Sequence, residues 1–462
     1  MNFRSIYLVL RLNICRIVEM RIIPAGFFIL CLLSLIISCE KEPIEERVPV
    51  KEKAPTEERA PIEQARQAMR LAKPPEILTD DLPPDRLAEG MEENIERLNK
   101  LKIQSLTFGP RVVSKEDYIL ALNYLVRQIR SGISRARFIQ TVVNNFDFYE
   151  VYGKDKWGEV LITSYYHPVI PGSRTKTSRY SQALYSVPPD LVNIRLDEFV
   201  EVIETLSPTK NHALEQISQI DVLRGRLVPS EWGGASTVLP YYTRQEIENN
   251  RILEGRNLEL AWVDPIDAFF MHIQGSGTVR FQEGEGLRLG YAAKNGHPFV
   301  PISKYLSDII PKGKMSMQAI ESYLRRLPKD EQRKILNKNP SYIFFQKLEG
   351  KAVTSLGAEV VDGRTIATDQ NFFPKGALAY MEFQKPVFRD GASIAPIRWQ
   401  PTARFVLDQD TGGAIRSPYR VDLYWGSGKE AARHAGVMKN WGRLYYLVPK
   451  DEFLQKLSKD SG

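Results

Sequence analysis

The alternation of apolar and polar residues predicts a strand-rich C-terminal part of the chain with two carboxylates at its centre. Apolar runs at 405–407 and 421–425 flank an Asp-Thr-Gly-Gly sequence at 410–413, which predicts two strands around a Gly-Gly turn. Asp422 lies between two apolar neighbours, where a strand face is half buried. A buried carboxylate is costly unless it is paired, hydrogen-bonded or protonated. Taken alone, Asp410 is an ordinary turn cap and Asp422 a solvated residue, but as a pair they favour a functional site.

The same patterns predict elements along most of the chain, starting near Asp85. Helices are expected where apolar residues recur at helical spacing, and strands where apolar runs stop at Pro or Gly. The expected helices are 114–129, 134–145, 196–206, 317–327 and 429–439. The expected strands are 159–168, 268–273, 364–368, 377–383, 404–407, 419–425 and 443–448. No internal repeat is visible.

Composition indicates a folded protein of two or three domains. The chain has 462 residues, of which 43% are hydrophobic and 10% aromatic, so a sizeable core is possible. The net charge of +7 is mild and comes with no basic cluster of the kind that nucleic acid requires. We therefore expect no nucleic-acid partner.

The N-terminus predicts a secreted, lipid-anchored protein. An apolar run at 27–37 follows Arg21 and ends in Ile-Ile-Ser-Cys at 36–39, which resembles a bacterial lipobox. We expect 1–38 to be a lipoprotein signal peptide and Cys39 to carry lipid, with Met20 as an alternative start. A simple signal peptide with an incidental cysteine is the other interpretation. After cleavage no second thiol remains, which leaves no disulfide and no Cys-ligated metal.

The segment 39–86 predicts a disordered tether. From 40 to 86 it contains eight prolines, many Glu and Lys residues and no aromatic residue, so it cannot bury a core. Fully extended, such a segment reaches on the order of 150 Å. A lipid-anchored domain is thus expected to work well away from its membrane.

Several familiar sites are excluded. The five histidines show no metal-ligand spacing, and no Gly-x-Ser-x-Gly elbow is present. The Asp-Thr-Gly at 410–412 matches half of an aspartic-protease site, which needs two such aspartates. The glycine-rich sequence at 426–431 opens a helix like a dinucleotide fingerprint, but no further strand-helix units follow it. We expect no metal and no organic cofactor.

A series of short segments resembles the membrane-bound lytic murein transglycosylase A family. The similar segments, in order, are Leu-Ile-Thr-Ser-Tyr-Tyr-His-Pro at 161–168, Ala-Trp-Val-Asp at 261–264, Ile-Gln-Gly-Ser-Gly at 273–277, Ala-Lys-Asn-Gly-His at 293–297, Ser-Met-Gln-Ala-Ile at 316–320 and Asn-Pro-Ser-Tyr-Ile-Phe-Phe at 339–345. The C-terminal part looks like a "three-aspartate" (3D) domain, whose aspartates fall on Asp369, Asp410 and Asp422. Ser164 departs from the family, which usually has glycine there.

The resemblance implies a mainly β fold with some α structure. It implies a double-psi β-barrel built from 87–168 and 347–462, into which a second, mostly β, substrate-binding domain of 169–346 is inserted. Substrate would lie in the groove between the two domains. Composition and periodicity alone do not give this barrel topology.

The resemblance also implies a lyase that acts on peptidoglycan. Such an enzyme cleaves the β-1,4 bond between N-acetylmuramic acid (MurNAc) and N-acetylglucosamine (GlcNAc) and leaves a 1,6-anhydro end. Because the sugar's own C6 hydroxyl attacks, one carboxyl suffices as acid and then base, whereas hydrolases need two. Burial and a neighbouring like charge both favour the protonated carboxyl that the first step needs, which favours Asp422 as the acid. Asp410 would stabilise positive charge or orient the sugar.

Further residues of the matching motifs are expected to bind the glycan. They are Thr163, Tyr165, Tyr166, Gln274, Gly275, Ser276, Trp425 and Gly426. Among them, the aromatic rings are expected to stack on sugar faces, and Gln274 and Ser276 to bind N-acetyl groups. Core packing and a structural turn are the respective alternatives, and Asp369 is expected to cap a turn.

The expected partners are peptidoglycan glycan strands and, through the anchor, a membrane. Because Glu40 is not an aspartate, the retention rule of enteric bacteria points to the periplasmic face of the outer membrane. We expect a monomer. The competing function is a non-catalytic glycan-binding or expansin-like wall-loosening module on the same barrel, which needs no protonated aspartate.

Overall fold

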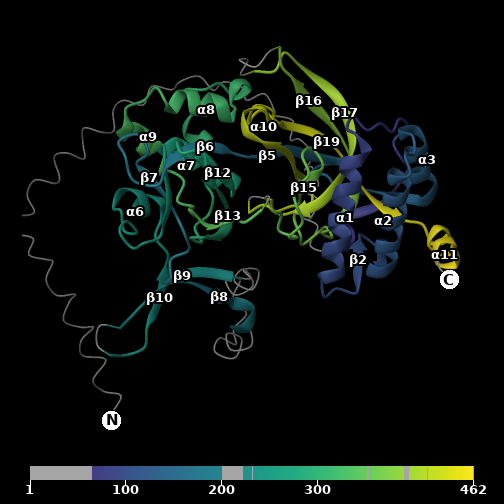
Figure 1. The fold of residues 1–462 in the computed structure, drawn as a ribbon, viewed down its shortest axis with the longest axis horizontal. Coiled ribbons are helices and arrows are strands. Elements are labelled where there is room, and N and C mark those ends of the chain that lie inside the picture. The colour runs from purple at the N-terminus through teal and green to yellow at the C-terminus, as the bar shows by residue number, and fades with distance from the viewer. Residues whose placement is uncertain are drawn as a thin grey trace, which may run out of the picture. The chain divides into compact units, whose positions relative to one another are not determined.

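The protein is described from a computed structural model, shown as a ribbon in Figure 1. The structure describes residues 65–199, 222–230, 233–350, 353–389, 395–413 and 415–460. The predicted signal peptide and Cys39 lie outside these ranges. Among the described residues, none of the helices combines the length and the apolar composition needed to cross a membrane.

The strands that carry the two aspartates belong to an eight-stranded sheet, which we call the barrel sheet. Its order is β1 (Met69–Ala72), β4 (Phe146–Val151), β19 (Lys439–Pro449), β16 (Ala377–Val387), β17 (Arg398–Asp410), β15 (Thr365–Ala367), β18 (Arg420–Ser427) and β5 (Glu159–His167). Strand β5 also pairs with β19, and this pairing closes six strands into a barrel. The mainly β fold class with a closed barrel is thereby confirmed.

The two aspartate strands are not neighbours in the barrel. Strand β15 lies between them, parallel to β17 and antiparallel to β18. The sequence 404–425 alone suggests two strands around one turn, but β17 and β18 instead lie on either side of β15. A strand inserted from elsewhere in the sequence cannot be read from local alternation, because alternation reports burial and not the partner.

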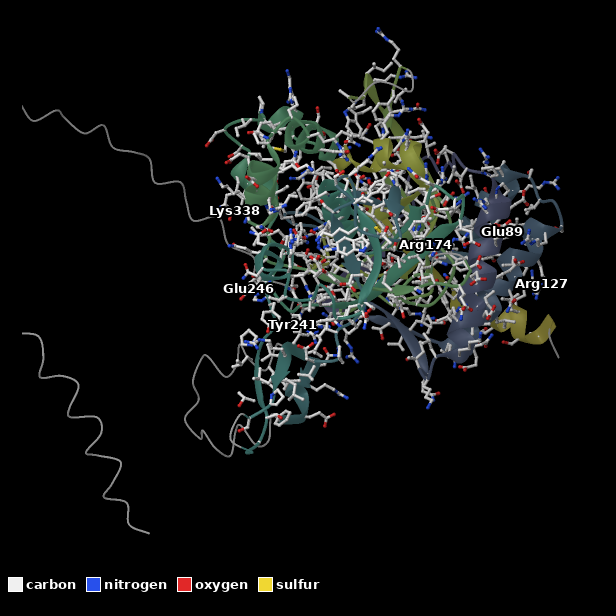
Figure 2. All side chains as sticks on the ribbon, turned by 60° about the vertical axis from the view of Figure 1, so that its left-hand side comes forward. Glu89, Arg127, Arg174, Tyr241, Glu246 and Lys338 are labelled. Atoms are coloured by element: carbon white, nitrogen blue, oxygen red, sulfur yellow. The ribbon has the colours of Figure 1, made fainter. Side chains whose placement is uncertain are left out.

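Helices cover the barrel sheet where the sequence predicts them. Ser114 and Ser134 cap helices α2 (Lys115–Arg130) and α3 (Arg135–Asn145) by accepting hydrogen bonds from the third residue of each helix. The remaining elements on this side are α1 (Pro84–Lys100), the hairpin β2 (Ser105–Phe108) and β3 (Arg111–Ser114), and α11 (Asp451–Asp460). Exposed side chains such as Glu89 and Arg127 mark the outer faces of α1 and α2 in Figure 2.

The folded part begins earlier than predicted, inside the segment 39–86. Strand β1 pairs with β4 at Met69–Ala72, after a short 3-10 helix, η1 (Ala65–Gln67). Asp80 then forms a buried ion pair with Arg364, whose side chain is 0% exposed, and the guanidinium also bonds the carbonyls of Leu82 and Pro83. The polar composition concealed this segment because only a few apolar residues, such as Met69, join the barrel core, while strand pairing and salt bridges supply the other contacts.

A second group of sheets is built from the middle of the chain. A six-stranded sheet has the order β14 (Ile343–Lys347), β13 (Gly286–Lys294), β12 (Gly277–Arg280), β6 (Val169–Ser173), β11 (Glu259–Val263) and β7 (Gln182–Tyr185). A three-stranded sheet has the order β10 (Thr237–Pro240), β9 (Val222–Val228) and β8 (Leu191–Arg195). Pro168 separates β5 of the barrel sheet from β6 of the six-stranded sheet. The helices here are α6 (Arg244–Asn249), α7 (Pro265–Gln274), α8 (Met317–Leu324) and α9 (Lys329–Leu336).

The strand predicted at 268–273 is wrong, because these residues form helix α7. Asp264 accepts hydrogen bonds from two backbone N–H groups as the N-cap, Pro265 opens the helix, and Gly275 ends it at φ +77°. The helix is buried over most of its circumference, so its apolar run has no helical period to detect. The flanking Asp-Pro and Gly were the signals that distinguish it from a strand.

The other elements differ from prediction mainly in length. The predicted barrel strands are present, and β16, β17 and β19 extend several residues further. Helix α8 ends at Leu324, and the last predicted helix is shorter, α10 (Gly428–Ala435), because β19 begins at Lys439. At 196–206 the structure has a 3-10 turn, η2 (Leu196–Phe199), and residues 200–206 lie outside the described ranges.

Candidate active site

The two aspartates lie on opposite sides of one residue of β15. Ala367 is the register partner of Asp410 on β17 and of Asp422 on β18. Two strand spacings therefore separate the backbones of the two aspartates, roughly 10 Å. The short strand β15, which the chain supplies from 365–367, sets the separation of the carboxylates.

The Asp422 carboxylate is held through both of its oxygens. Thr163, its register partner on β5, donates its hydroxyl to Oδ1. Arg420 donates Nε to Oδ1 at 3.1 Å and Nη2 to Oδ2 at 3.2 Å. The Asp422 side chain is 17% exposed, so these contacts are only partly screened by solvent.

Arg420 is the functional residue that sequence reasoning missed. It lies two positions before Asp422 on the same strand, so the two side chains share a face. Its Nε also donates to the Thr163 hydroxyl at 3.3 Å, which makes one cluster of the three side chains. The signal available in the sequence was an arginine two positions before a carboxylate on the same predicted strand.

Asp410 is held by neutral donors. Tyr165 donates its hydroxyl to Oδ2 at 2.8 Å, and the backbone N–H groups of Ser355 and Thr411 each donate to Oδ1 at 2.9 Å. Burial, and then the charge of Asp410, raises the pKa of Tyr165 well above its usual range. The phenol therefore stays protonated at neutral pH and donates to Asp410.

Tyr165 connects the two aspartates. It is the register partner of Tyr424, two residues after Asp422, and the two rings lie 5.2 Å apart. Thr163 and Tyr165, both predicted to contact substrate, thus lie on the carboxylate face of β5. The two aspartates, Thr163 and Tyr165 thus lie together on this part of the barrel sheet.

Tyr166 and Trp425 lie on the other face of their strands. Tyr166 packs against Ala431 and Ala435 of α10. The Trp425 indole donates to the Met438 sulfur at 2.9 Å, and its ring packs beside the barrel core. The structure does not bring these two aromatic residues to the carboxylates, and the core-packing alternative describes Trp425 better.

A mainly apolar pocket of about 210 Å³ opens on this second face. It lies between β5, α7, α8 and α10, and its lining includes Ser164, Tyr166, Phe269, Gln274, Met317 and Gly436. Since Ser164 and Tyr166 alternate with Thr163 and Tyr165 along β5, the pocket and the carboxylates lie on opposite sides of that strand.

The predicted contacts at 274–276 are tied to the end of β5. Gln274 accepts a hydrogen bond from the Tyr166 backbone N–H at 3.1 Å, and Gly275 is the left-handed residue that ends α7. The Ser276 hydroxyl lies 3.4 Å from Nδ1 of His167. These contacts fit a structural turn that joins the barrel sheet to the six-stranded sheet.

Gly426 and Asp369 have local structural roles. Gly426 has φ +113°, and a Cβ there would lie 3.0 Å from the Asp362 carboxyl group. Asp369 accepts a hydrogen bond from the Asn371 N–H at 3.1 Å, which is the predicted turn cap. Within the described ranges, no three His, Cys, Asp or Glu side chains come together as metal ligands.

Two family models match the chain. Residues 161–346 match the "MltA specific insert domain", and residues 364–448 match the "3D domain". Membrane-bound lytic murein transglycosylase A of Escherichia coli strain K12 is 29% identical over 306 residues, which cover 65% of this chain and 69% of that protein. The protein of the same name from Vibrio cholerae is 33% identical over 213 residues, covering 44% and 55% of the two chains.

Solved structures of similar proteins have the same fold. The membrane-bound lytic murein transglycosylase of Agrobacterium tumefaciens superposes with a TM-score of 0.63 at 26% identity, covering 83% of this chain and 98% of that one. MltA of Neisseria gonorrhoeae gives a TM-score of 0.58 at 26% identity, covering 80% and 88%. E. coli MltA with bound chitohexaose gives a TM-score of 0.60 at 23% identity, covering 83% and 95%, and shows the fold alone.

The family models, the relatives and the solved structures agree on one class of protein, the lytic murein transglycosylases. The chain belongs to the membrane-bound lytic murein transglycosylase A family. The family resemblance found in the sequence is thereby confirmed.

The buried histidine at the end of β5 predicts that the stability of the protein depends on pH. His167 bonds Thr278 Oγ1 at 2.9 Å, and burial, with a smaller effect of Arg288, lowers its pKa to about 4. Because this value lies below the ordinary pKa of about 6.5, the unfolded chain binds more protons between the two values. The contribution of His167 to stability is therefore complete above about pH 6.5 and is lost as the pH falls toward 4.

We expect the free energy of unfolding to fall by about 1 kcal/mol from pH 7 to pH 5.5 because of His167 alone. Urea unfolding of the parent and of His167→Gln at both pH values measures this effect. The variant should show a smaller loss of stability on acidification than the parent. Equal losses in the two proteins would contradict the assignment.

Proposed function

We propose that this chain is a peptidoglycan lytic transglycosylase, a lyase that cleaves the β-1,4 MurNAc–GlcNAc bond and leaves a 1,6-anhydro-MurNAc end. The observation that carries the proposal is the Asp422 carboxylate, held by Thr163 and Arg420 on a barrel strand within the 3D match. The relatives named as lytic murein transglycosylases support the activity. We propose 87–168 and 347–462 as the catalytic domain and 169–346 as the inserted substrate-binding domain.

One carboxyl group accounts for both proton transfers. Asp422 donates its proton to the O4 leaving oxygen of GlcNAc as the bond from that oxygen to C1 of MurNAc breaks. The C6 hydroxyl of the same MurNAc attacks C1, and the Asp422 carboxylate accepts the C6 proton. No water enters the balance, so the second carboxylate that a hydrolase places within about 5 to 9.5 Å as nucleophile or base is not required.

The hydrogen bonds at Asp422 indicate which oxygen carries the proton. Oδ1 accepts from both Thr163 and Arg420 Nε, whereas Oδ2 has Arg420 Nη2 as its one partner among the described residues. We assign the transferred proton to Oδ2, because releasing one long contact costs less than releasing two. Protonation of Oδ2 requires its contact with Arg420 Nη2 to be released when glycan enters.

Asp410 has a different role in this proposal. Its Oδ1 is occupied by two backbone N–H groups and its Oδ2 by the Tyr165 phenol. A carboxylate whose two oxygens already accept three hydrogen bonds from its own surroundings is a poor proton shuttle. It would instead stabilise the positive charge that develops at the anomeric carbon or orient the sugar. Gln274, Gly275, Ser276 and Gly426 remain proposed glycan contacts near the groove.

The second candidate function is a glycan-binding or expansin-like module. It would use the same barrel face without proton transfer. The ion pair at Asp422 is compatible with it, but the arrangement of Thr163 and Arg420 around one carboxylate is more than binding requires. We propose glycan strands of peptidoglycan as the partners, and the E. coli MltA structure with bound chitohexaose supports binding of a glycan. We also propose a monomer without cofactor.

The central prediction concerns the acid. Asp422→Asn and Asp422→Ala should abolish release of anhydro-sugar ends from sacculi, because an amide cannot donate and then retrieve a proton. General acid–base catalysis contributes about 10² to 10⁴ in rate, and one group here serves both steps. Binding of insoluble peptidoglycan should be retained. Mass spectrometry of the digested sacculi measures the ends.

Two matched variants sharpen this experiment. Asp410→Asn should cost less turnover than Asp422→Asn, and Asp155→Asn, an exposed aspartate outside the proposed machinery, should cost none. Near-normal turnover of Asp422→Asn with a dead Asp410→Asn would show that the roles are reversed. If Asp422→Asn and Asp410→Asn both keep their activity, the catalytic site lies elsewhere.

We also propose that Cys39 carries lipid and holds the protein at the periplasmic face of the outer membrane. The support is the apolar run at 27–37 and the Ile-Ile-Ser-Cys sequence that follows. A Cys39→Ala protein should appear in the soluble fraction after a salt wash, whereas the parent stays with membranes. If the Cys39→Ala protein still partitions fully with membranes, the proposed lipid anchor is contradicted.

A further inference from the structure

The barrel face that carries Asp422 continues across β5 onto β19. In one row, Asp422 is the register partner of Thr163, which is in turn the partner of Lys439. In the next row, Arg420 is the partner of Leu161, and Leu161 the partner of Trp441. Residues directly opposite each other on paired strands point to the same face of a sheet. Trp441 therefore lies on the same face as Asp422.

Trp441 is unusually open for a tryptophan on a barrel strand. It is 45% exposed, while the residues of β19 from Leu444 onward are buried. Among the described residues, its indole ring makes no stacking or cation–π contact with another side chain. Leu161 lies half-buried between it and Arg420 and forms an apolar floor. An exposed ring beside an apolar floor is a surface without an evident packing role.

The register also gives the distance from the proposed cleavage site. Two strand spacings and two residues along the strand separate the backbones of Trp441 and Asp422, roughly 12 Å. A sugar ring stacked on Trp441 is therefore not the ring on which Asp422 acts. A glycan that contacts both residues must extend from β18 across β5.

We propose that Trp441 is a stacking platform for a pyranose ring of a β-1,4-linked N-acetylated glycan, at a subsite beyond the cleaved bond. A pyranose presents an apolar C–H face that packs on a flat aromatic ring, and its hydroxyl and acetyl oxygens remain at the edge. Lys439 lies in the Asp422 row, and Arg420 lies at the other end of the Trp441 row. Both side chains supply hydrogen-bond donors for those oxygens. The inference rests on the proposed function for the identity of the glycan.

Binding, measured without cleavage, tests the platform. Chitohexaose is titrated into the Asp422→Asn protein, and the same titration is repeated with Trp441 replaced in that background. Trp441→Ala should weaken binding roughly ten-fold, because a stacked ring contributes up to about one decade in affinity. Trp441→Phe keeps a flat ring and should bind within about three-fold of the parent. Trp441→Leu keeps apolar bulk without a ring and should bind as weakly as Trp441→Ala.

The control is Trp399→Ala. Trp399 is 38% exposed on β17, opposite Pro386 and far along the strand from the aspartates, and its replacement should leave the affinity unchanged. Affinity that survives in Trp441→Ala, or that Trp441→Leu retains as well as Trp441→Phe, would overturn the platform. A lack of saturable chitohexaose binding by the Asp422→Asn protein would overturn it as well.

The outcome is separable from that of the proposed function. If sacculi are cleaved with anhydro ends but the Trp441 variants bind normally, the platform fails and the lytic activity stands. If no cleavage is seen while the Trp441 variants lose affinity as expected, the platform stands as a glycan-binding site and the transglycosylase proposal fails.

Discussion

The three residues of β15 are the constraint on which the site depends. Thr365, Ile366 and Ala367 are all buried and all pair with β17 on one side, while Ile366 and Ala367 also pair with β18 on the other. Without this strand the two aspartates would belong to separate parts of the barrel wall. Its position is fixed at Arg364, which is fully buried and bonds both Asp80 and the carbonyl of Phe405. Removing either partner of such a buried pair leaves an uncompensated charge, so the polar N-terminal segment supports the face that carries the two aspartates.

The electrostatic surroundings of the two aspartates differ in kind, although both are carboxylates on strands that flank β15. Asp422 meets a hydroxyl and a guanidinium, whereas Asp410 meets a phenol and two backbone N–H groups. A side-chain contact can be released by a small rotation, whereas backbone donors are fixed. This difference, rather than burial alone, makes Asp422 the better candidate for a group that must gain and lose a proton.

Sequence reasoning succeeded where a local signal determines the structure. The capped helices after Ser114 and Ser134, and Asp422 between two buried neighbours, follow from spacing and caps. Reasoning failed where partners come from distant segments. Helix α7 has the pattern of a strand because burial on most sides removes its helical period, and β15 between β17 and β18 leaves no local trace. The same is true of the site. The aspartates can be found from the sequence, but which face of the strand Tyr166 and Trp425 point to depends on the strand register.

The claim that one carboxyl group and the sugar's own C6 hydroxyl suffice is tested most directly by the origin of the oxygen at the new end. Sacculi digested in ¹⁸O-labelled water, with their fragments analysed by mass spectrometry, report whether water attacked C1. Intramolecular attack predicts 1,6-anhydro ends that contain no ¹⁸O. Reducing ends that carry ¹⁸O at C1 in the initial products would contradict the account and would require a second group that activates water.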